Sequence, residues 1–132
     1  MANALYPLAK QSFLKADLDL DSEVRVILVD LADYTYNTAH DMLDDVPAGA
    51  RVAVSAAVAS KTFINGTFDH ADFTFTAVSG DPSEALIWYQ HTGTESTSRL
   101  ICFMDTGVTG LPVTPNGGDI NVTVSASGVF SL

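Results

Sequence analysis

Short segments of alternating apolar and polar residues fill the chain from Glu23 to Leu132. Turns rich in glycine, proline, asparagine and aspartate separate these segments, a spacing that is typical of antiparallel strands. About eight strands in some 110 residues favour a sandwich or a barrel over alternating strand–helix units. The pattern therefore predicts an all-β fold, with one antiparallel β-sandwich domain spanning residues 1–132.

The strand candidates are the segments with strict alternation or a high content of β-branched and aromatic residues. They are 17–29, 51–64, 67–68, 73–76, 85–89, 100–103, 120–124 and 129–130. The strongest hairpin signal is Asn65-Gly66, because these residue types tolerate the left-handed backbone of a tight two-residue turn. We expect 85–89, with Trp88 and Tyr89, to be a central strand that contributes aromatic bulk to the core.

Two segments have helical spacing instead. The apolar positions of the first are Leu5, Leu8, Ala9, Phe13 and Leu14. Their spacing predicts an N-terminal helical segment within residues 1–16 that packs on the sandwich. A second short helix is expected near residues 39–46, where Thr38 could cap its start and Pro47 would end it.

Acidic residues dominate the charge of the chain, with 16 acids, 6 bases and a formal net charge of −10. Such a surface repels phosphates, so we expect no nucleic-acid partner. Nine of the 16 acids lie between Asp17 and Asp45, which indicates one acidic face that favours solubility. Neither a membrane span nor a secretion signal is recognisable, so we expect no membrane partner and folding in a cytoplasm.

The aspartates at 17, 19 and 21 have the spacing of the first ligands in a calcium-binding loop. That loop also needs glycine at its sixth position and glutamate at its twelfth, where this chain has Ser22 and Leu28. We therefore interpret the segment as a strand and predict no metal site.

The three histidines, His40, His70 and His91, are far apart and share no ligand spacing, so we expect them in loops or facing solvent. The single cysteine, Cys102, lies in an apolar segment, which predicts a buried and inert thiol. We predict no catalytic residues and no cofactor.

Two functional alternatives depend on features that a sequence does not display. A sugar-binding module would need an exposed aromatic platform, and a hydrolase would need a pocket with carboxylates of shifted pKa. Candidates for the platform are Tyr34, Tyr36, Trp88 and Tyr89, for which core packing is the simpler interpretation.

Five stretches together resemble a family of small virion proteins from tailed bacteriophages, and the resemblance runs from about Leu5 to Leu132. The stretches are Val26–Asp30, Pro47–Ala53, Ala85–Tyr89, Thr92–Ile101 and Gly110–Ile120. The last two are the most distinctive, because order, spacing and residue types all agree. Near 124–128, by contrast, this chain lacks an insertion that relatives commonly carry.

The resemblance implies a jelly-roll β-sandwich without catalytic activity, of the kind that decorates phage heads as a cement protein. On this reading the partner is the major capsid protein, bound on the outside of the expanded head. Each copy would bridge neighbouring capsid subunits, as part of a dimer or trimer on the capsid. The alternative within the virion is a tail or baseplate component that takes part in adhesion.

For the surface that contacts the capsid or another subunit, the sequence points to the apolar residues of the N-terminal segment. They are Leu5, Tyr6, Leu8, Phe13 and Leu14. The alternative is that this segment only closes one end of the sandwich.

Overall fold

The computed structural model describes residues 3–132, which form nine short strands, one α-helix and four 3₁₀ turns. The strands are β1 (Ala4–Leu5), β2 (Val24–Val29), β3 (Arg51–Val54), β4 (Thr67–Phe68), β5 (Phe73–Phe75), β6 (Ala85–Gln90), β7 (Leu100–Met104), β8 (Ile120–Val122) and β9 (Phe130–Ser131). The helix is α1 (Pro7–Leu14), and the 3₁₀ turns are η1 (Leu43–Asp45), η2 (Ala48–Ala50), η3 (Ile64–Gly66) and η4 (Glu95–Thr97). The prediction of a β-rich fold with antiparallel sheets and a short N-terminal helix is confirmed.

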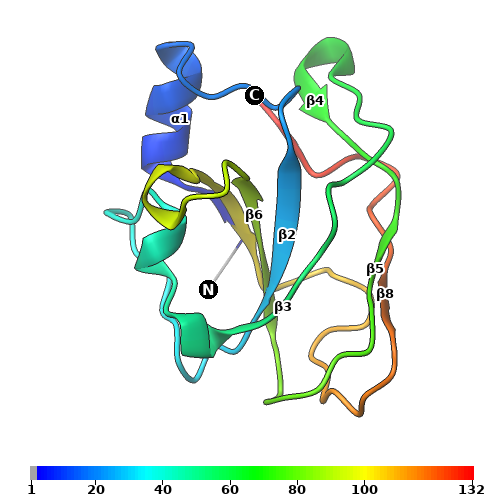
Figure 1. Cartoon of the computed structure of the whole chain (residues 1–132). Helices are drawn as coiled ribbons and strands as arrows, with labels where there is room; N and C mark the ends of the chain where they lie inside the picture. The colour runs from blue at the N-terminus through cyan, green and yellow to red at the C-terminus, as the bar shows by residue number, and fades with distance from the viewer. Residues whose placement is uncertain (1–2) are drawn as a thin grey trace.

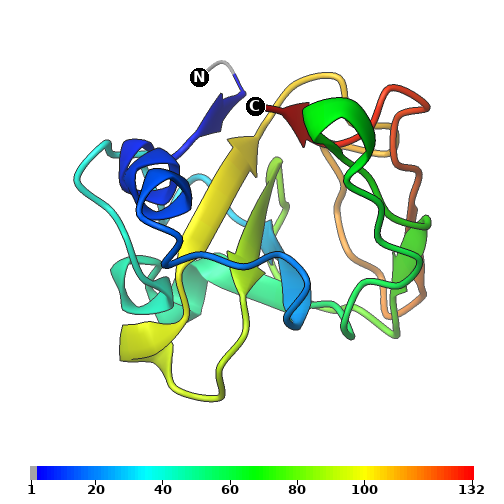
Figure 2. The same cartoon turned by 90° about the horizontal axis from the view of Figure 1, so that it is seen from above.

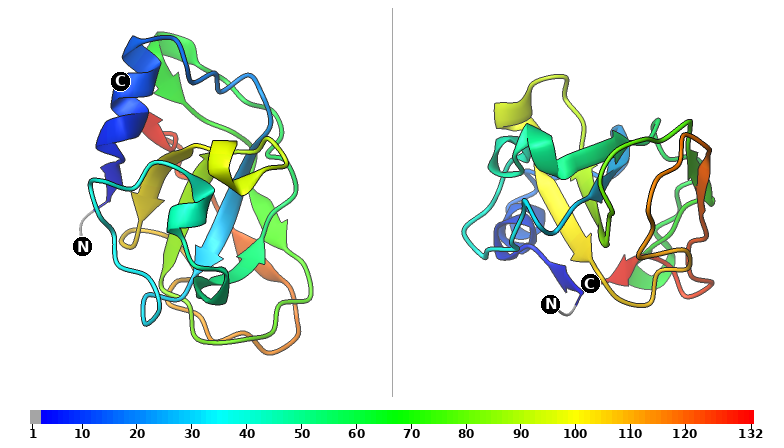
Figure 3. Two further views of the ribbon diagram at one scale, coloured as in Figure 1. Left: turned by 60° about the vertical axis from the view of Figure 1, so that its left-hand side comes forward. Right: turned by 90° about the horizontal axis from the view of Figure 1, so that it is seen from below.

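Five strands form one antiparallel sheet in the order β1-β7-β6-β2-β3. The remaining strands form two antiparallel ribbons, β4 with β9 and β5 with β8. Figure 1 shows the ribbons to one side of the sheet and α1 on the other side, and the views in Figures 2 and 3 agree. The sheet is therefore covered on both faces.

Because both faces of the sheet are covered, the apolar side chains on both sides of the central strands are buried. Trp88 in β6 faces the ribbons, where its indole N–H donates to the buried His70. Its neighbour Ile87 points to the opposite face, opposite Phe103 of β7, whose ring lies near Tyr34. The predicted central position of this strand is confirmed, since β6 pairs with both β2 and β7.

Several predicted boundaries were wrong. The strand expected from Asp17 begins only at Val24, although Leu18 and Leu20 are buried and the aspartates beside them are exposed. Local hydrogen bonds occupy the backbone there, since the N–H of Asp21 donates to the carboxylate of Asp19. Alternating burial thus arises without a strand.

The segment around α1 differs from the prediction in one respect. The structure begins it with a strand, because β1 pairs with β7 through Leu5 opposite Cys102. Pro7 then opens the helix, where its missing N–H is not needed. Residues 1–2 of the predicted segment lie outside the described residues.

Of the turn or two of helix predicted near residues 39–46, the structure forms only the three-residue 3₁₀ turn η1. The carboxylate of Asp45 accepts the N–H groups of Asp41 and Met42, and Met42 pairs with Arg99 in an isolated bridge. Thr38 is not the cap, a position that Met42 occupies. Side-chain hydrogen bonds and the sheet therefore outcompete a regular helix.

The predicted turn at Asn65-Gly66 is confirmed, since both residues have left-handed backbones with φ of 55° and 76°. The bridge between Thr62 and Asp69 closes the hairpin. The returning strand β4 pairs on its other side with β9, so that the C-terminal residue Leu132 lies against Gly66. The predicted strand over 51–64 shortens to Arg51–Val54.

Candidate functional site

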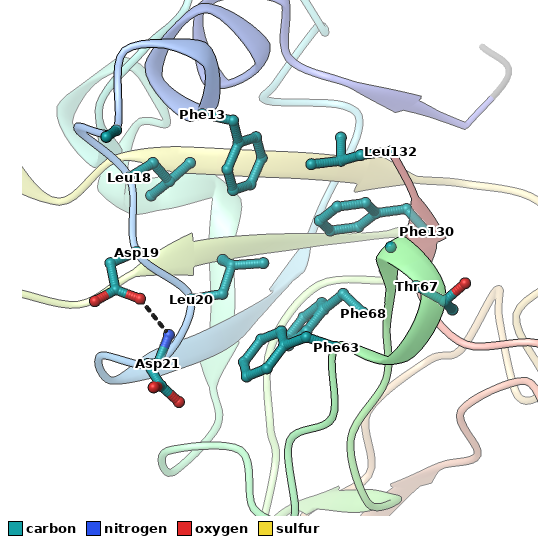
Figure 4. Close-up of a pocket in the computed structure, with 12 residues that line it drawn as sticks. Phe13, Leu18, Asp19, Leu20, Asp21, Phe63, Thr67, Phe68, Phe130 and Leu132 are labelled. Atoms are coloured by element: carbon teal, nitrogen blue, oxygen red, sulfur yellow. Dashed lines mark hydrogen bonds between the residues drawn. The ribbon is translucent and has the colours of Figure 1, made fainter.

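An apolar groove of about 510 Å³ opens at the end of the molecule where α1 ends and β4 and β9 pair. Figure 4 shows its side chains converging from three parts of the chain. The lining residues are Phe13, Ala16, Leu18, Asp19, Leu20, Asp21, Phe63, Gly66, Thr67, Phe68, Phe130 and Leu132. The groove thus joins the α1–β2 loop to the β4–β9 ribbon.

Aromatic rings build the floor of the groove. Phe130 lies between Phe13 and Phe68, with ring centroids 6.1 and 5.5 Å away. Phe63 stacks on Phe68 at 5.8 Å with an interplanar angle of 14°. Because Phe68 is buried while Phe63 is 43% exposed, the stack runs from the core to the surface.

The lip of the groove carries unusually exposed apolar side chains. Leu132, which lines the groove and lies against Gly66, is 70% exposed, and Ile64, next to the lining residue Phe63, is 69% exposed. Gathered exposed apolar residues of this kind are typical of surfaces that bind another molecule. The backbone of this lip is defined, since the N–H of Leu132 donates to Gly66 at 3.0 Å.

The opposite lip is acidic. Asp19 and Asp21 lie beside the apolar side chains in Figure 4, and both are exposed. The ammonium of Lys61 holds this loop by donating to the backbone carbonyls of Leu20 and Asp21, at 2.8 and 3.0 Å, and of Ser22. The lysine fixes the backbone of the loop, while its aspartates face solvent.

The residues singled out from the N-terminal segment have quite different environments. Tyr6 is fully buried, and Leu5 and Leu8 are half-buried. Phe13 is half-buried and lines the groove, whereas Leu14 is 90% exposed at the end of α1. In this conformation Phe13 and Leu14 are therefore the members of the set best placed to contact another molecule.

Tyr6 instead belongs to a buried chain of polar groups. Its hydroxyl lies 2.7 Å from that of Tyr34, which lies 2.8 Å from Nδ1 of His40. Burial, the nearby Tyr34 and their hydrogen bond raise the pKa of Tyr6 far above its usual range. Burial likewise raises the pKa of Tyr34 to about 12, so both phenols stay neutral at physiological pH.

His70 lies in a loop, as one half of the expectation for the histidines allows, but it does not face solvent: it is buried between the sheet and the β5–β8 side. Its Nε2 accepts the indole N–H of Trp88 at 2.9 Å, so Nδ1 carries the proton and donates to the carbonyl of Ala71 at 2.8 Å. Burial lowers the pKa of His70, which keeps the ring neutral. Nothing in the spacing of residues along the sequence indicated that His70 would be a buried hydrogen-bonding residue.

The predicted burial of Cys102 is confirmed, and burial raises the pKa of its thiol well above the usual range. Core packing is also confirmed for three of the four aromatic residues that could have formed a sugar-binding platform. Tyr34, Trp88 and Tyr89 are buried, and Tyr36 is half-buried with its ring 5.0 Å from that of Tyr6. These four residues do not form an exposed aromatic platform.

One group of three carboxylates in the described residues lies close enough together to hold a cation, and it does not include the aspartates at 17, 19 and 21. Asp30, Asp33 and Asp81 each place an oxygen atom within 4.8 Å of the others. Oxygen donors of this kind suit a hard cation such as Ca²⁺. One of them is already engaged, since Asp30 accepts the N–H of Ala32 at 2.9 Å.

A second, smaller cavity of about 240 Å³ lies between the central sheet and the C-terminal segment. Leu86, Trp88 and Met104 line it from the sheet, and Val122 and Val129 line it from the other side.

In the part of the chain that the structure describes, no helix has the length and apolar character needed to cross a bilayer.

Comparison with models of known protein families gives no match to this chain, and neither does comparison with the sequences of curated proteins.

The groove was not predicted as a site from the sequence. Of its aromatic lining, only Phe13 was singled out, whereas Phe63, Phe68 and Phe130 lie in segments interpreted as strands and turns. The one usable signal was the apolar Phe63-Ile64 beside a tight turn, where polar residues are usual.

Proposed function

We propose that this protein is a non-enzymatic structural component of a phage virion, a decoration or cement protein of the head. In this proposal it binds the outer surface of the expanded head and bridges subunits of the major capsid protein. The sequence resemblance supplies the virion class. The open apolar groove, on an otherwise acidic molecule, is the observation that carries a binding role.

The fold that accompanies this proposal is a jelly-roll-like β-sandwich. The five-stranded sheet would be one layer, and the β4–β9 and β5–β8 ribbons would together make the second. One contact across these layers supports this arrangement: the ring of His70, which lies near Phe68 of β4 and Phe73 of β5, also lies near Trp88 of the sheet.

Stabilisation of a lattice by many bound copies follows from mass action. A ligand at one hundred times its dissociation constant adds about 2.7 kcal/mol per site to the state that it binds. A dimer or trimer on the capsid would strengthen this effect, because the second contact of a bound oligomer is intramolecular. The net charge of −10 suits the outer surface better than the DNA-filled interior.

The deciding experiment mixes the purified protein with undecorated expanded heads of the same phage and images them by cryo-electron microscopy. Ordered density at repeated positions on the outer surface is the expected result. Bare heads would overturn the proposal. Density on isolated tails or baseplates would favour the alternative within the virion.

A further inference from the structure

We propose that the groove binds an extended segment of a partner protein in which an apolar side chain is followed closely by lysine or arginine. This deepens the proposed function and depends on it only for the identity of the partner, a capsid subunit. The inference itself rests on two neighbouring surfaces, an apolar floor and an acidic lip.

The floor fits an apolar anchor. Phe13, Phe68 and Phe130 form a continuous aromatic surface, and Leu18 and Leu20 close it on the side of the α1–β2 loop. Water against this surface gains few hydrogen bonds, so an apolar side chain that displaces it lowers the free energy. The volume of about 510 Å³ has room for more than one side chain, which suits a peptide segment.

The charges beside the floor decide what should flank the anchor. Asp19 and Asp21 lie at its edge in Figure 4, and within residues 3–132 neither carboxylate forms an ion pair. Asp17, nearby in the same loop, is paired with Lys15 at 3.6 Å. Lys61, which contacts the same loop, donates to three backbone carbonyls. A cationic side chain therefore complements the lip.

Charge also favours a basic segment over the other occupants that an apolar groove could bind. A second copy of the chain brings another net charge of −10, and an anionic membrane brings a negative surface. Both are repelled by the acidic lip, whereas a segment with lysine or arginine is attracted. A basic, apolar segment is thus the occupant that the charges favour.

The test titrates the full chain with a short fluorescent peptide that has two leucines followed by two lysines at its centre. Fluorescence anisotropy gives the affinity, and amide chemical shifts from NMR locate the binding. We expect shifts at 18–21, 63–68 and 130–132, and weaker binding at high salt. A peptide with glutamates in place of the lysines should bind at least about fivefold more weakly.

Two sets of variants separate the contribution of the acidic lip to binding from that of the apolar groove. The pair Asp19→Asn and Asp21→Asn keeps the side-chain acceptor of the loop and should weaken the lysine peptide by about three- to tenfold. Asp44→Asn with Asp119→Asn removes the same charge outside the groove and should leave the affinity unchanged. Phe63→Ser should weaken both peptides, unlike Val54→Ser, which alters a similarly exposed residue outside the lining.

Equal affinity for the two peptides, or chemical shifts outside the groove, would overturn the inference. So would a dimer of the free protein that Phe63→Ser dissolves, because the groove would then hold a second copy. Decoration of heads separates this inference from the proposed function. If heads are decorated as well by Phe63→Ser as by the natural chain, the groove inference fails and the proposed function stands.

Discussion

The central strands and the groove end of this protein are built in opposite ways. β2, β6 and β7 have five or six residues each and are buried almost throughout. β4 and β9 have two residues each, and the residues close to them in the chain include Ile64 and Leu132, which are among the most exposed apolar side chains of the described residues. The difference indicates a division of labour, in which the sheet supplies stability and the groove end supplies a surface.

Shortening one side chain in each region tests whether the sheet contributes more to stability than the groove end does. Ile87→Ala leaves a cavity in the fully buried sheet and should lower the free energy of unfolding by about 2–5 kcal/mol. Phe63→Ala, at the exposed end of the aromatic stack in the groove, should cost about 1 kcal/mol or less. Urea unfolding measures both, and equal losses would contradict the division of labour.

A glycine that contacts β4 should be an exception to the small stability losses expected at the groove end. Gly128 has φ of 88°, and a Cβ there would lie 2.6 Å from Cγ2 of Thr67 and 2.9 Å from the carbonyl of Phe68. Gly128→Ala should therefore cost about 2–4 kcal/mol, from backbone strain and from displacement of β4. Gly117 has φ of 90° and open space around it, so Gly117→Ala isolates the strain and should cost about 1–2 kcal/mol. Similar losses in urea unfolding would show that the packing around Gly128 is loose.

His70 links the sheet to the ribbon side and should make that contact sensitive to pH. Because burial lowers the pKa of His70, the unfolded chain takes up the proton first as the pH falls below about 6.5. Its contribution to stability is complete above that pH and decreases as the pH falls towards the lower pKa of the folded state.

His70→Gln removes this titration and should also cost about 1–2 kcal/mol at neutral pH through weaker hydrogen bonds. Urea unfolding at pH 7.5 and 5.5 should show a larger decrease for the natural chain than for the variant. The other histidines are common to both proteins and cancel. Parallel pH profiles would contradict a buried neutral His70.

The smallest effect concerns the loop that carries the acidic lip. Lys61→Met removes three hydrogen bonds to backbone carbonyls that water can partly replace, so we expect a loss of about 1 kcal/mol. Hydrogen exchange should nevertheless accelerate for the amides of residues 18–22, more than for those of β6. Unchanged exchange in that loop would show that Lys61 does not fix the lip. Lys10→Met, at an exposed position on α1, is the matched control.

The hydrophobic pattern alone determined the β-rich class, the core strands at 85–89 and 100–103, the helix near Pro7 and the turn at Asn65-Gly66. These features follow from local preferences and from period-two burial, which act over a few neighbouring residues. The pattern also determined that Leu18 and Leu20 are buried and the aspartates between them exposed.

Tertiary structure decided the rest. Lys61, far along the chain, holds the loop at 17–23 through three of its backbone carbonyls, and the bridge from Met42 to Arg99 accompanies the reduction of the helix expected at 39–46 to the 3₁₀ turn Leu43–Asp45. The groove exists only because Phe13, Phe68 and Phe130, far apart in sequence, meet at one end of the molecule. Such meetings depend on long-range strand pairing, which no local pattern encodes.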